Sequence, residues 1–267
     1  SFHLNYSIII LIIFFIVLKR RGIMHKKEIS VVVPCYNEGK TIKNNILELM
    51  VYLNSNFGEN YEIIAVNDGS KDNTINEFNE LKSNLPQLKV VDYGKNMGKG
   101  YAVRKGMFTA KGKYIFFTDA DLSTPCEEIK RAVDTMIENN IDVLIGSRAL
   151  KDSNVERKQP FYRVFMGRVF SFLANAIVPL GGIVDTQCGF KCFTYKAAKN
   201  IFSLQKMTGF SFDVEILYIA RLKNYKIYEM PITWVNDEDS KVNPIKDSLK
   251  MFRDLWKIRK LHKKTRR

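Results

Sequence analysis

Histidine and cysteine are scarce in this chain, which limits the kinds of site that it can build. Its 267 residues include three histidines and four cysteines. The histidines, His3, His25 and His262, all lie near the ends of the chain, so neither histidine-based catalysis nor a histidine metal site is expected. Cys188 and Cys192 are four residues apart, but no second pair completes a zinc site or a disulfide framework. We therefore expect reduced thiols.

Other sequence signals are missing as well. No Gly-x-Gly-x-x-Gly follows the first predicted strand, which argues against a dinucleotide-dependent dehydrogenase. No internal repeat or low-complexity linker divides the chain, and its length suits one large α/β domain or two small ones. The hydrophobic share of 46% is enough for a packed core and excludes global disorder.

Acidic residues are few relative to basic ones. The chain has 42 Lys and Arg against 28 Asp and Glu, a formal net charge of +14. Such a charge attracts nucleic acid, a phosphorylated substrate or an anionic membrane surface. The positive charge is concentrated after the first apolar segment and at the C-terminus, while acids follow the predicted strands. A membrane-tethered nucleic-acid-binding protein is thus the less favoured interpretation, and no nucleic-acid partner is expected.

The first 18 residues contain no charged side chain. A helix of this length spans about 27 Å, which is close to the ~30 Å hydrocarbon core of a bilayer. Lys19, Arg20 and Arg21 follow, and this is the reverse of the charge order in a signal peptide. We expect residues 1–21 to be a single membrane anchor with the rest of the chain cytoplasmic, at the endoplasmic reticulum in a eukaryote or the plasma membrane in a prokaryote.

Apolar, β-branched runs alternate with amphipathic stretches from residue 28 onward. The runs predict strands at residues 29–33, 61–66, 88–91, 114–117 and 142–145. The amphipathic stretches predict helices at residues 41–53, 73–81, 101–110 and 127–138. This alternation is typical of an α/β fold with a mostly parallel sheet covered on both faces. Ligands of such sheets bind beyond the carboxyl ends of the strands, where we place Pro34, Asp68, Asp119 and Arg148.

The pattern changes after Arg148. Residues 161–183 are aromatic and apolar and carry Arg163, so this segment is either an ordinary helix or one that lies in a membrane interface. Residues 191–193 and 226–234 are expected to add strands. Residues 249–261 have helical periodicity, and we assign residues 246–267 to a basic amphipathic C-terminal helix and tail that attracts anionic lipid.

Two carboxylates, Asp119 and Asp121, follow the strand predicted at residues 114–117. If the strand continues, residues two apart lean the same way and their charges repel. A divalent cation removes this conflict, and hard oxygen ligands suit Mg²⁺ or Mn²⁺. The alternative is a solvated loop with a local turn, because so short a motif is often found without a metal.

Seven motifs occur in an order that is similar to a known family. They are Val33-Pro-Cys-Tyr-Asn-Glu38, Val66-Asn-Asp-Gly-Ser-Lys-Asp-Asn-Thr74, Asn96-Met-Gly-Lys-Gly100, Thr118-Asp-Ala-Asp121, Gly146-Ser-Arg148, Asp185-Thr-Gln-Cys-Gly-Phe-Lys191 and Phe212-Asp-Val-Glu215. The series resembles the family 2 inverting glycosyltransferases, most of all the dolichyl-phosphate β-glucosyltransferase branch. The resemblance covers residues 28–245 and implies the GT-A fold, an αβα sandwich that binds nucleotide-diphospho-sugars.

The resemblance also implies roles for individual residues. The expected nucleotide-sugar contacts are Pro34, Tyr36, Glu38, Asp68, Lys99, Asp119, Ala120 and Gln187. The expected metal ligands are Asp121 and Asp119, and the expected catalytic residues are Asp121, Asp185, Arg148 and Lys241. The acceptor phosphate is assigned to Arg148, Arg163 and Ser240, and a supporting role goes to Asp213 and Glu215, which orient the sugar or the arginines or simply cap a helix. Two departures from the family pattern stand out, namely Asn67, where an acid is usual, and Ser123, where mannose synthases tend to have Gln.

These residues together predict transfer of a hexose, with glucose from UDP-glucose favoured, onto a membrane polyprenyl (dolichyl) phosphate. A phosphate monoester has a second pKa of about 6, so it is already anionic at neutral pH and needs no general base. Catalysis then depends on positioning and charge stabilisation, with Mg²⁺ or Mn²⁺ beside the leaving diphosphate. Asp185 as a base is a separate hypothesis. GDP-mannose as donor and a glycan hydroxyl as acceptor are the alternatives, and a homo-oligomer is considered among the partners.

Overall fold

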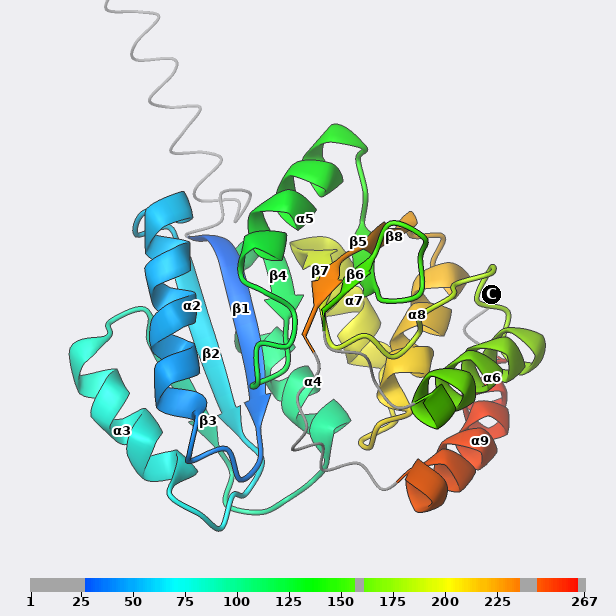
Figure 1. Cartoon of the computed structure of the whole chain (residues 1–267), viewed down its shortest axis with the longest axis horizontal. Helices are drawn as coiled ribbons and strands as arrows, with labels where there is room; N and C mark the ends of the chain where they lie inside the picture. Colours follow the sequence, from blue (N-terminus) through cyan, green and yellow to red (C-terminus); the bar gives the residue numbers. More distant parts are fainter. Residues whose placement is uncertain (1–26, 157–160, 236–243, 264–267) are drawn as a thin grey trace, which may run out of the picture.

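The computed structural model of this chain describes residues 27–156, 161–235 and 244–263 (Figure 1). Residues 1–21, expected to form a membrane anchor, lie outside these ranges, as do Ser240 and Lys241. Within the described ranges, no helix has both the length and the apolar character that crossing a membrane requires.

A seven-stranded sheet forms the centre of the structure, in the order β3-β2-β1-β4-β7-β5-β8. Its strands are β1 (Lys27–Cys35), β2 (Tyr61–Asn67), β3 (Leu88–Asp92), β4 (Gly112–Phe117), β5 (Val143–Ser147), β7 (Lys191–Thr194) and β8 (Ile227–Pro231). β7 runs antiparallel to its two neighbours β4 and β5, and the remaining pairs are parallel. A separate pair joins β6 (Asn154–Val155) to β9 (Thr233–Trp234). The mostly parallel sheet expected from the sequence is confirmed.

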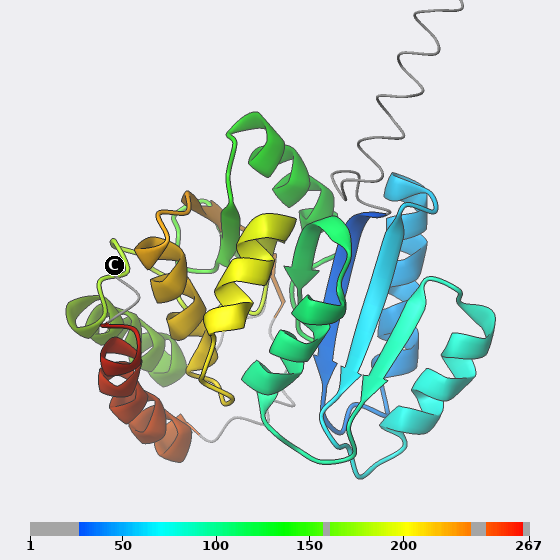
Figure 2. The same ribbon diagram turned by 180° about the vertical axis from the view of Figure 1, so that it is seen from behind.

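Helices cover both faces of this sheet (Figures 1 and 2). One face carries α2 (Ile42–Phe57), α3 (Thr74–Asn84) and α5 (Glu127–Glu138). The other carries α4 (Lys99–Thr109), α7 (Tyr195–Leu204) and α8 (Phe212–Leu222). Beyond α8, at one end of the molecule, α6 (Phe161–Ile177) lies beside α9 (Pro244–Leu261). The αβα sandwich is therefore confirmed.

The strand sequences are apolar throughout because both of their faces are buried. In β1, Val32 contributes to the core beneath α4, whereas Val31 and Val33 contribute to the core beneath α2. All three side chains are at most 1% exposed. Continuous β-branched runs are typical of such two-sided burial.

Several expected boundaries are wrong. Pro34 lies inside β1 rather than after it, and the helix predicted at residues 161–183 ends at Ile177. The strand expected at residues 226–234 is divided, because Ile232 turns its amide to the carbonyl of Ser147 and the last two residues join the second sheet. Helices α7 and α8 were not predicted. In α8, residues 212–220 are all buried, so the sequence has no polar face to reveal a helical period.

Gly106 is the point at which α4 meets the sheet, and it gives a test of this packing. A Cβ at this position would collide with the side chain of Val32, which is fully buried in the central strand β1. We expect Gly106→Ala to lower the free energy of unfolding by about 1–3 kcal/mol through overpacking, although alanine favours helices. Urea unfolding followed by circular dichroism measures this change.

Gly167 in α6 is the matched control, because a Cβ there meets no atom within 4 Å. Gly167→Ala should stabilise the chain by up to about 1 kcal/mol, since only helix propensity changes. Equal effects of the two substitutions would contradict the packing described for α4.

Candidate active site

The acidic turn Asp119–Asp121 begins where β4 ends at Phe117. The amide of Thr118 still donates to the carbonyl of Val32 (3.0 Å), but Leu122 has a left-handed backbone with φ of 49°. Strand geometry therefore does not continue through the pair, contrary to one premise of the sequence prediction. An unfavourable backbone of this kind in a non-glycine residue occurs often at functional sites.

The two carboxylates of the turn have different surroundings. Asp119 forms an ion pair with Lys99 (Oδ1 to Nζ, 2.6 Å), and both side chains are partly exposed. Asp121 accepts a hydrogen bond from the amide of Ser123 (2.9 Å). Burial opposes the charge of Asp119, but Lys99 outweighs it and lowers the pKa of Asp119. Burial and the neighbouring charge of Asp119 together raise the pKa of Asp121.

Asp121 is the better of the two carboxylates for a divalent cation, because Asp119 is already paired with Lys99. Its charge is repelled by Asp119 and is not matched by an ion pair among the described residues. A hard cation would relieve that repulsion, so the donor chemistry fits Mg²⁺ or Mn²⁺. No group of three or more His, Cys, Asp or Glu in the described part of the chain can hold a metal ion unaided. A cation here would therefore need further ligands beside these side chains, such as backbone, water or substrate oxygens.

Lys99 owes its position to the start of α4. It is the first residue of that helix, after the N-cap Gly98, whose φ is 97°. A Cβ on Gly98 would lie 2.5 Å from the carbonyl oxygen of Thr208, so only glycine fits this close approach. A helix N-terminus preceded by such a loop is a favourable place for a phosphate.

Asp68 holds the loop that leads to this helix. It is 3% exposed and accepts hydrogen bonds from the hydroxyl of Tyr93 (2.6 Å) and from the amides of Met97 (2.7 Å) and Gly98 (2.9 Å). Burial and the bond to Asp68 raise the pKa of Tyr93. In this structure Asp68 thus fixes the backbone beside Lys99, and its expected contact with a nucleotide stays a prediction.

Three other expected nucleotide-sugar residues lie close to these segments. Tyr36 and Glu38 belong to the turn after β1, where the amide of Glu38 donates to the hydroxyl of Thr74 (2.9 Å). Ala120 is buried, and its carbonyl accepts from the side chain of Asn45 (2.8 Å). These contacts shape the turns, while the proposed contacts with a nucleotide sugar are untested.

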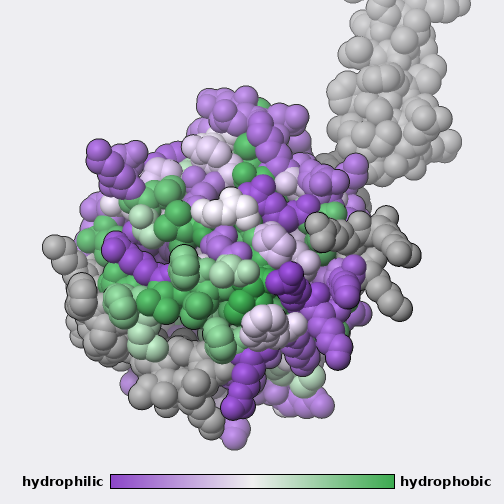
Figure 3. Space-filling view, turned by 90° about the vertical axis from the view of Figure 1, so that its right-hand side faces the viewer, coloured by the Kyte–Doolittle hydropathy of each residue, from purple (hydrophilic) through white to green (hydrophobic). Residues whose placement is uncertain are grey.

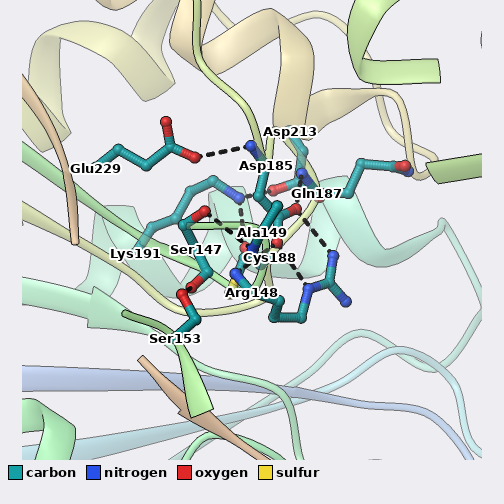
Figure 4. Close-up of polar contacts among 10 residues, drawn as sticks. All are labelled: Ser147, Arg148, Ala149, Ser153, Asp185, Gln187, Cys188, Lys191, Asp213 and Glu229. Carbon is teal, nitrogen blue, oxygen red and sulfur yellow. Dashed lines mark hydrogen bonds and ion pairs between the residues drawn. The ribbon is translucent and has the colours of Figure 1, made fainter. Parts of the chain in front are cut away.

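Arg148 and Asp185 form a bidentate ion pair (Figure 4). Asp185 Oδ2 accepts from Nε (2.7 Å) and from the amide of Arg148 (3.0 Å), and Oδ1 accepts from a terminal guanidinium nitrogen (2.9 Å). The guanidinium also lies over the ring of Trp234, at 5.3 Å from its centroid. Burial opposes ionisation, but Arg148 prevails and lowers the pKa of Asp185. A carboxylate stabilised as an anion is a weak base, which disfavours the hypothesis of Asp185 as general base.

Glu229 on β8 positions the backbone that carries Asp185, and sequence reasoning missed it. Its carboxylate accepts from the amides of Val184 (3.0 Å) and Asp185 (2.8 Å), as Figure 4 shows for Asp185. The parallel pairing of β8 with β5 sets Glu229 opposite Ile145, close to Arg148. No local sequence signal marks this glutamate, because the contact depends on strand register.

Lys191 is a second residue that the sequence did not single out by itself. It is fully buried, and its Nζ lies 2.5 Å from Asp213 and 2.5 Å from the carbonyl oxygen of Cys188. Nζ also lies 5.3 Å from the centre of the Phe117 ring. Burial raises the pKa of Asp213. The pair therefore joins α8 to the loop at residues 185–190.

The same loop approaches the acidic turn at Gly189. A Cβ on this residue would overlap the carboxylate of Asp119, so glycine permits the contact. Gln187 lies in the same loop, where its amide donates to Asp185 (3.3 Å) and its side-chain nitrogen is 3.7 Å from the sulfur of Met251. Asp119, Asp185, Gln187 and Arg148 are thus gathered around one loop.

The remaining predicted residues are placed less directly. Glu215 accepts from the amides of Lys206 and Met207 and lies 2.7 Å from His262 Nε2. Among the described residues, the ion pairs of Asp213 and Glu215 are with Lys191 and His262. Their expected role in orienting the sugar or the arginines stays a prediction. The backbone of Arg163 lies in α6, but its side chain is outside the described part of the chain.

Comparison with known proteins identifies the family. The protein-family model described as "Glycosyl transferase family 2" matches residues 30–202 of this chain. The chain belongs to glycosyl transferase family 2. It is therefore an enzyme of the glycosyltransferase class, as the order of its motifs predicted.

Curated relatives are similar over most of the chain. A dolichyl-phosphate beta-glucosyltransferase of Dictyostelium discoideum is 35% identical over 241 residues, which are 86% of this chain and 73% of the relative. The Homo sapiens protein of the same name is 35% identical over 244 residues, covering 87% of this chain and 75% of the relative. The Saccharomyces cerevisiae protein is 35% identical over 247 residues, covering 86% and 74%.

Solved structures share the fold. Glucosyl-3-phosphoglycerate synthase from Mycobacterium tuberculosis, crystallised with Mn²⁺, UDP and glucosyl-3-phosphoglycerate, superimposes with a TM-score of 0.64. Its sequence identity is 19%, and the match covers 87% of this chain and 78% of the synthase. A likeness at this identity supports the GT-A fold and no more.

The buried pair of Lys191 and Asp213 allows a test of how the site is supported. We expect Lys191→Met to lower the free energy of unfolding by about 3–5 kcal/mol, because Asp213 loses its close partner in the interior. Adding Asp213→Asn should recover part of that loss, since the uncompensated charge is removed. Urea unfolding of the single and double variants measures both effects.

Lys130→Met is the matched control, because the ion pair of Lys130 with Asp134 has both side chains 49% exposed. Its effect should stay within about 1 kcal/mol. A loss for Lys191→Met no larger than that of Lys130→Met would show that the buried pair does not support the fold.

Proposed function

We propose that this chain transfers glucose from UDP-glucose to a membrane polyprenyl phosphate, with dolichyl phosphate as the acceptor and inversion at the anomeric carbon. The relatives named dolichyl-phosphate beta-glucosyltransferase support the sugar and the acceptor. The observation that carries the proposal is the position of Arg148. Its guanidinium is paired with Asp185 and also interacts electrostatically with Asp119 of the acidic turn. One site thus combines an acidic turn for a metal–diphosphate with a guanidinium for an anion.

The donor half of the proposed site lies around α4 and the acidic turn. Lys99 at the helix N-terminus and the backbone of residues 98–100 would contact the diphosphate. Asp121 would hold Mg²⁺ or Mn²⁺, while Asp119 remains with Lys99. When bound, the cation supplies charge neutralisation for the leaving nucleoside diphosphate.

The acceptor half would lie at Arg148. Its side chain is 28% exposed, while Asp185 beneath it is 8% exposed, so the guanidinium has an accessible part and a buried support. Planar, bidentate donors of this kind recognise phosphate oxygens well. Because a phosphate acceptor is already anionic, Arg148 has only to align it with the sugar carbon, and no proton needs to be removed.

The remaining untested assignments belong to the same proposal. Residues 1–21 would anchor the chain in the membrane that holds the acceptor, with the enzymatic domain on the cytoplasmic side. Arg163, Ser240 and Lys241 would complete the contacts with phosphate groups. Gln187 would contact the donor sugar, because it lies in the loop between Arg148 and the acidic turn.

A donor panel with the full chain in membranes tests the proposal. Radiolabelled UDP-glucose, but not GDP-mannose, should label the lipid extract when dolichyl phosphate is supplied. The anomeric configuration of the product, measured by NMR, should be β. Labelling from GDP-mannose, or transfer to a soluble glycan without any polyprenyl phosphate, would overturn the assignment of donor or acceptor.

The metal assignment gives a second, separate expectation. Asp121→Asn should lower the transfer rate by about 10²-fold or more, because the cation contributes several kcal/mol of charge stabilisation. EDTA should abolish transfer, and Mn²⁺ or Mg²⁺ should restore it. Asp134→Asn on the exposed face of α5 is the control and should leave the rate unchanged.

This metal requirement should also depend on pH. Protons compete with a cation for the carboxylate of Asp121, and its pKa is raised, so the competition begins at a higher pH than for an ordinary aspartate. The Mn²⁺ concentration for half-maximal transfer should therefore rise as the pH falls toward that raised pKa. A half-maximal concentration that does not change with pH, or metal-independent transfer, would exclude Asp121 as the ligand.

A further inference from the structure

Helix α9 presents a buried stripe to the protein, in addition to the exposed apolar side chains that Figure 3 shows at this end of the molecule. The stripe consists of Met251, Leu255, Ile258 and His262, which follow at intervals of four, three and four residues and so share one side of the helix. All four residues are at most 6% exposed. The amide of His262 donates to the carbonyl of Ile258 (3.2 Å), so it continues the last helical turn. A histidine buried at the end of such a stripe needs a hydrogen-bond partner.

Glu215 of α8 is the partner of this histidine. His262 Nε2 lies 2.7 Å from Glu215 Oε1, and the two side chains are 4% and 0% exposed. An ionised carboxylate only accepts hydrogen bonds, so Nε2 donates. The ring of His262 also meets the ring of Tyr218 on α8 edge to face, with 6.4 Å between the centroids. One hydrogen bond and one aromatic contact thus attach the end of α9 to α8.

The carboxylate of Glu215 also holds a segment that has no regular structure. Residues 205–209 lie between α7 and α8 and belong to neither helix, and we call them the 205–209 segment. Backbone amides outside helices and strands need other partners when they are shielded from water. Glu215 accepts from the amides of Lys206 (2.9 Å) and Met207 (2.7 Å). The same carboxylate is therefore shared between the 205–209 segment and His262.

The 205–209 segment packs against the first turn of α4. The carbonyl of Thr208 accepts from the amide of Tyr101 (3.1 Å), and the side-chain nitrogen of Gln205 donates to the carbonyl of Gly100 (2.8 Å). A Cβ on Gly100 would lie 2.9 Å from a carbonyl oxygen of the segment, so the two backbones are in close contact. The turn that they hold begins with Lys99, which forms the ion pair with the acidic turn.

We propose that His262 is a positioning residue for the donor half of the site. Through Glu215 it fixes the 205–209 segment, and this segment sets the first turn of α4, where Lys99 would contact the diphosphate. The effect on donor binding rests on the proposed function, whereas the effect on the segment does not. The hydrogen bond is the decisive link, because it ends on the carboxylate that holds both amides of the segment.

Two substitutions separate the hydrogen bond from the aromatic contact. His262→Gln keeps a donor nitrogen at a similar reach and loses the ring, whereas His262→Phe keeps a ring and loses the donor. Hydrogen–deuterium exchange of the full chain in detergent, without donor or acceptor, reports local opening at the amides of Lys206 and Met207. Exchange should be about tenfold faster in His262→Phe, as expected for one lost hydrogen bond to a charged group. His262→Gln should exchange like the unsubstituted chain.

Steady-state kinetics of the same variants test the effect on the donor. In His262→Phe the KM for UDP-glucose should rise about tenfold, while kcat and the KM for dolichyl phosphate change less than about twofold, because only donor binding is weakened. His262→Gln should restore the KM for the donor. A general loss of packing would instead change kcat and both KM values together.

Lys43→Met is the matched control. Lys43 of α2 also donates to a glutamate of another helix, Glu80 of α3, but the two side chains are 40% and 61% exposed. This substitution should change neither the exchange of the 205–209 segment nor the KM for UDP-glucose.

The reverse order of the two variants, with faster exchange in His262→Gln than in His262→Phe, would overturn the proposal and leave His262 only a packing role beside Tyr218. An effect of His262→Phe no larger than that of Lys43→Met would overturn it too, as would faster exchange with an unchanged KM for the donor. If His262→Phe does not fold, His262→Gln decides alone, because normal exchange and donor KM support the proposal and a change in either overturns it. Absence of glucosyl transfer by the unsubstituted chain would refute the proposed function, and the exchange result would still stand.

Discussion

The site depends on one strand, β7, which enters the sheet antiparallel and places a buried lysine between two loops. Lys191 pairs in register with Phe117 at the end of β4 and with Ile145 in β5. The acidic turn follows Phe117, and Arg148 follows β5, so both segments leave strands that pair with Lys191. A buried ammonium requires a partner, and Asp213 on α8 provides it. This requirement fixes α8, β7 and both loops relative to one another.

The electrostatic balance around Lys191 is compatible with the metal and the phosphate proposed for this site. Within the described residues, the candidate site contains three cationic and four carboxylate side chains. They are Lys99, Arg148 and Lys191, and Asp119, Asp121, Asp185 and Asp213. Three of these carboxylates have a cationic partner, and Asp121 is the one left to repulsion and burial. Because the unmatched charge is a single carboxylate, a divalent cation brings the site to a net positive charge. A diphosphate can then approach without losing an existing ion pair.

The sequence predicted the parts of this structure that follow from burial, and it failed where contacts depend on long-range register. Strands such as β1 and β2 were predictable because both faces are apolar. The expectation that ligands bind beyond the carboxyl ends of the strands follows from the parallel order of the sheet and stays a prediction. Glu229 could not be foreseen, because only the pairing of β8 with β5 brings it to Asp185. His262 was set aside as a terminal residue, yet α9 returns it to the core, where it contacts Glu215.

Helix α9 packs against segments that support the candidate site. Helix α9 and the residue after it contact three segments near the site: Met251 reaches Gln187, Asp254 binds Ser211, and His262 binds Glu215. Glu215 in turn holds the amides of residues 206 and 207, close to Thr208, which packs against Gly98 below Lys99. These contacts link α9 both to the loop at residues 185–190 and, through Glu215, to the segment that packs against the N-terminus of α4. The helix that closes this end of the fold therefore also supports the groups proposed to bind the two phosphates.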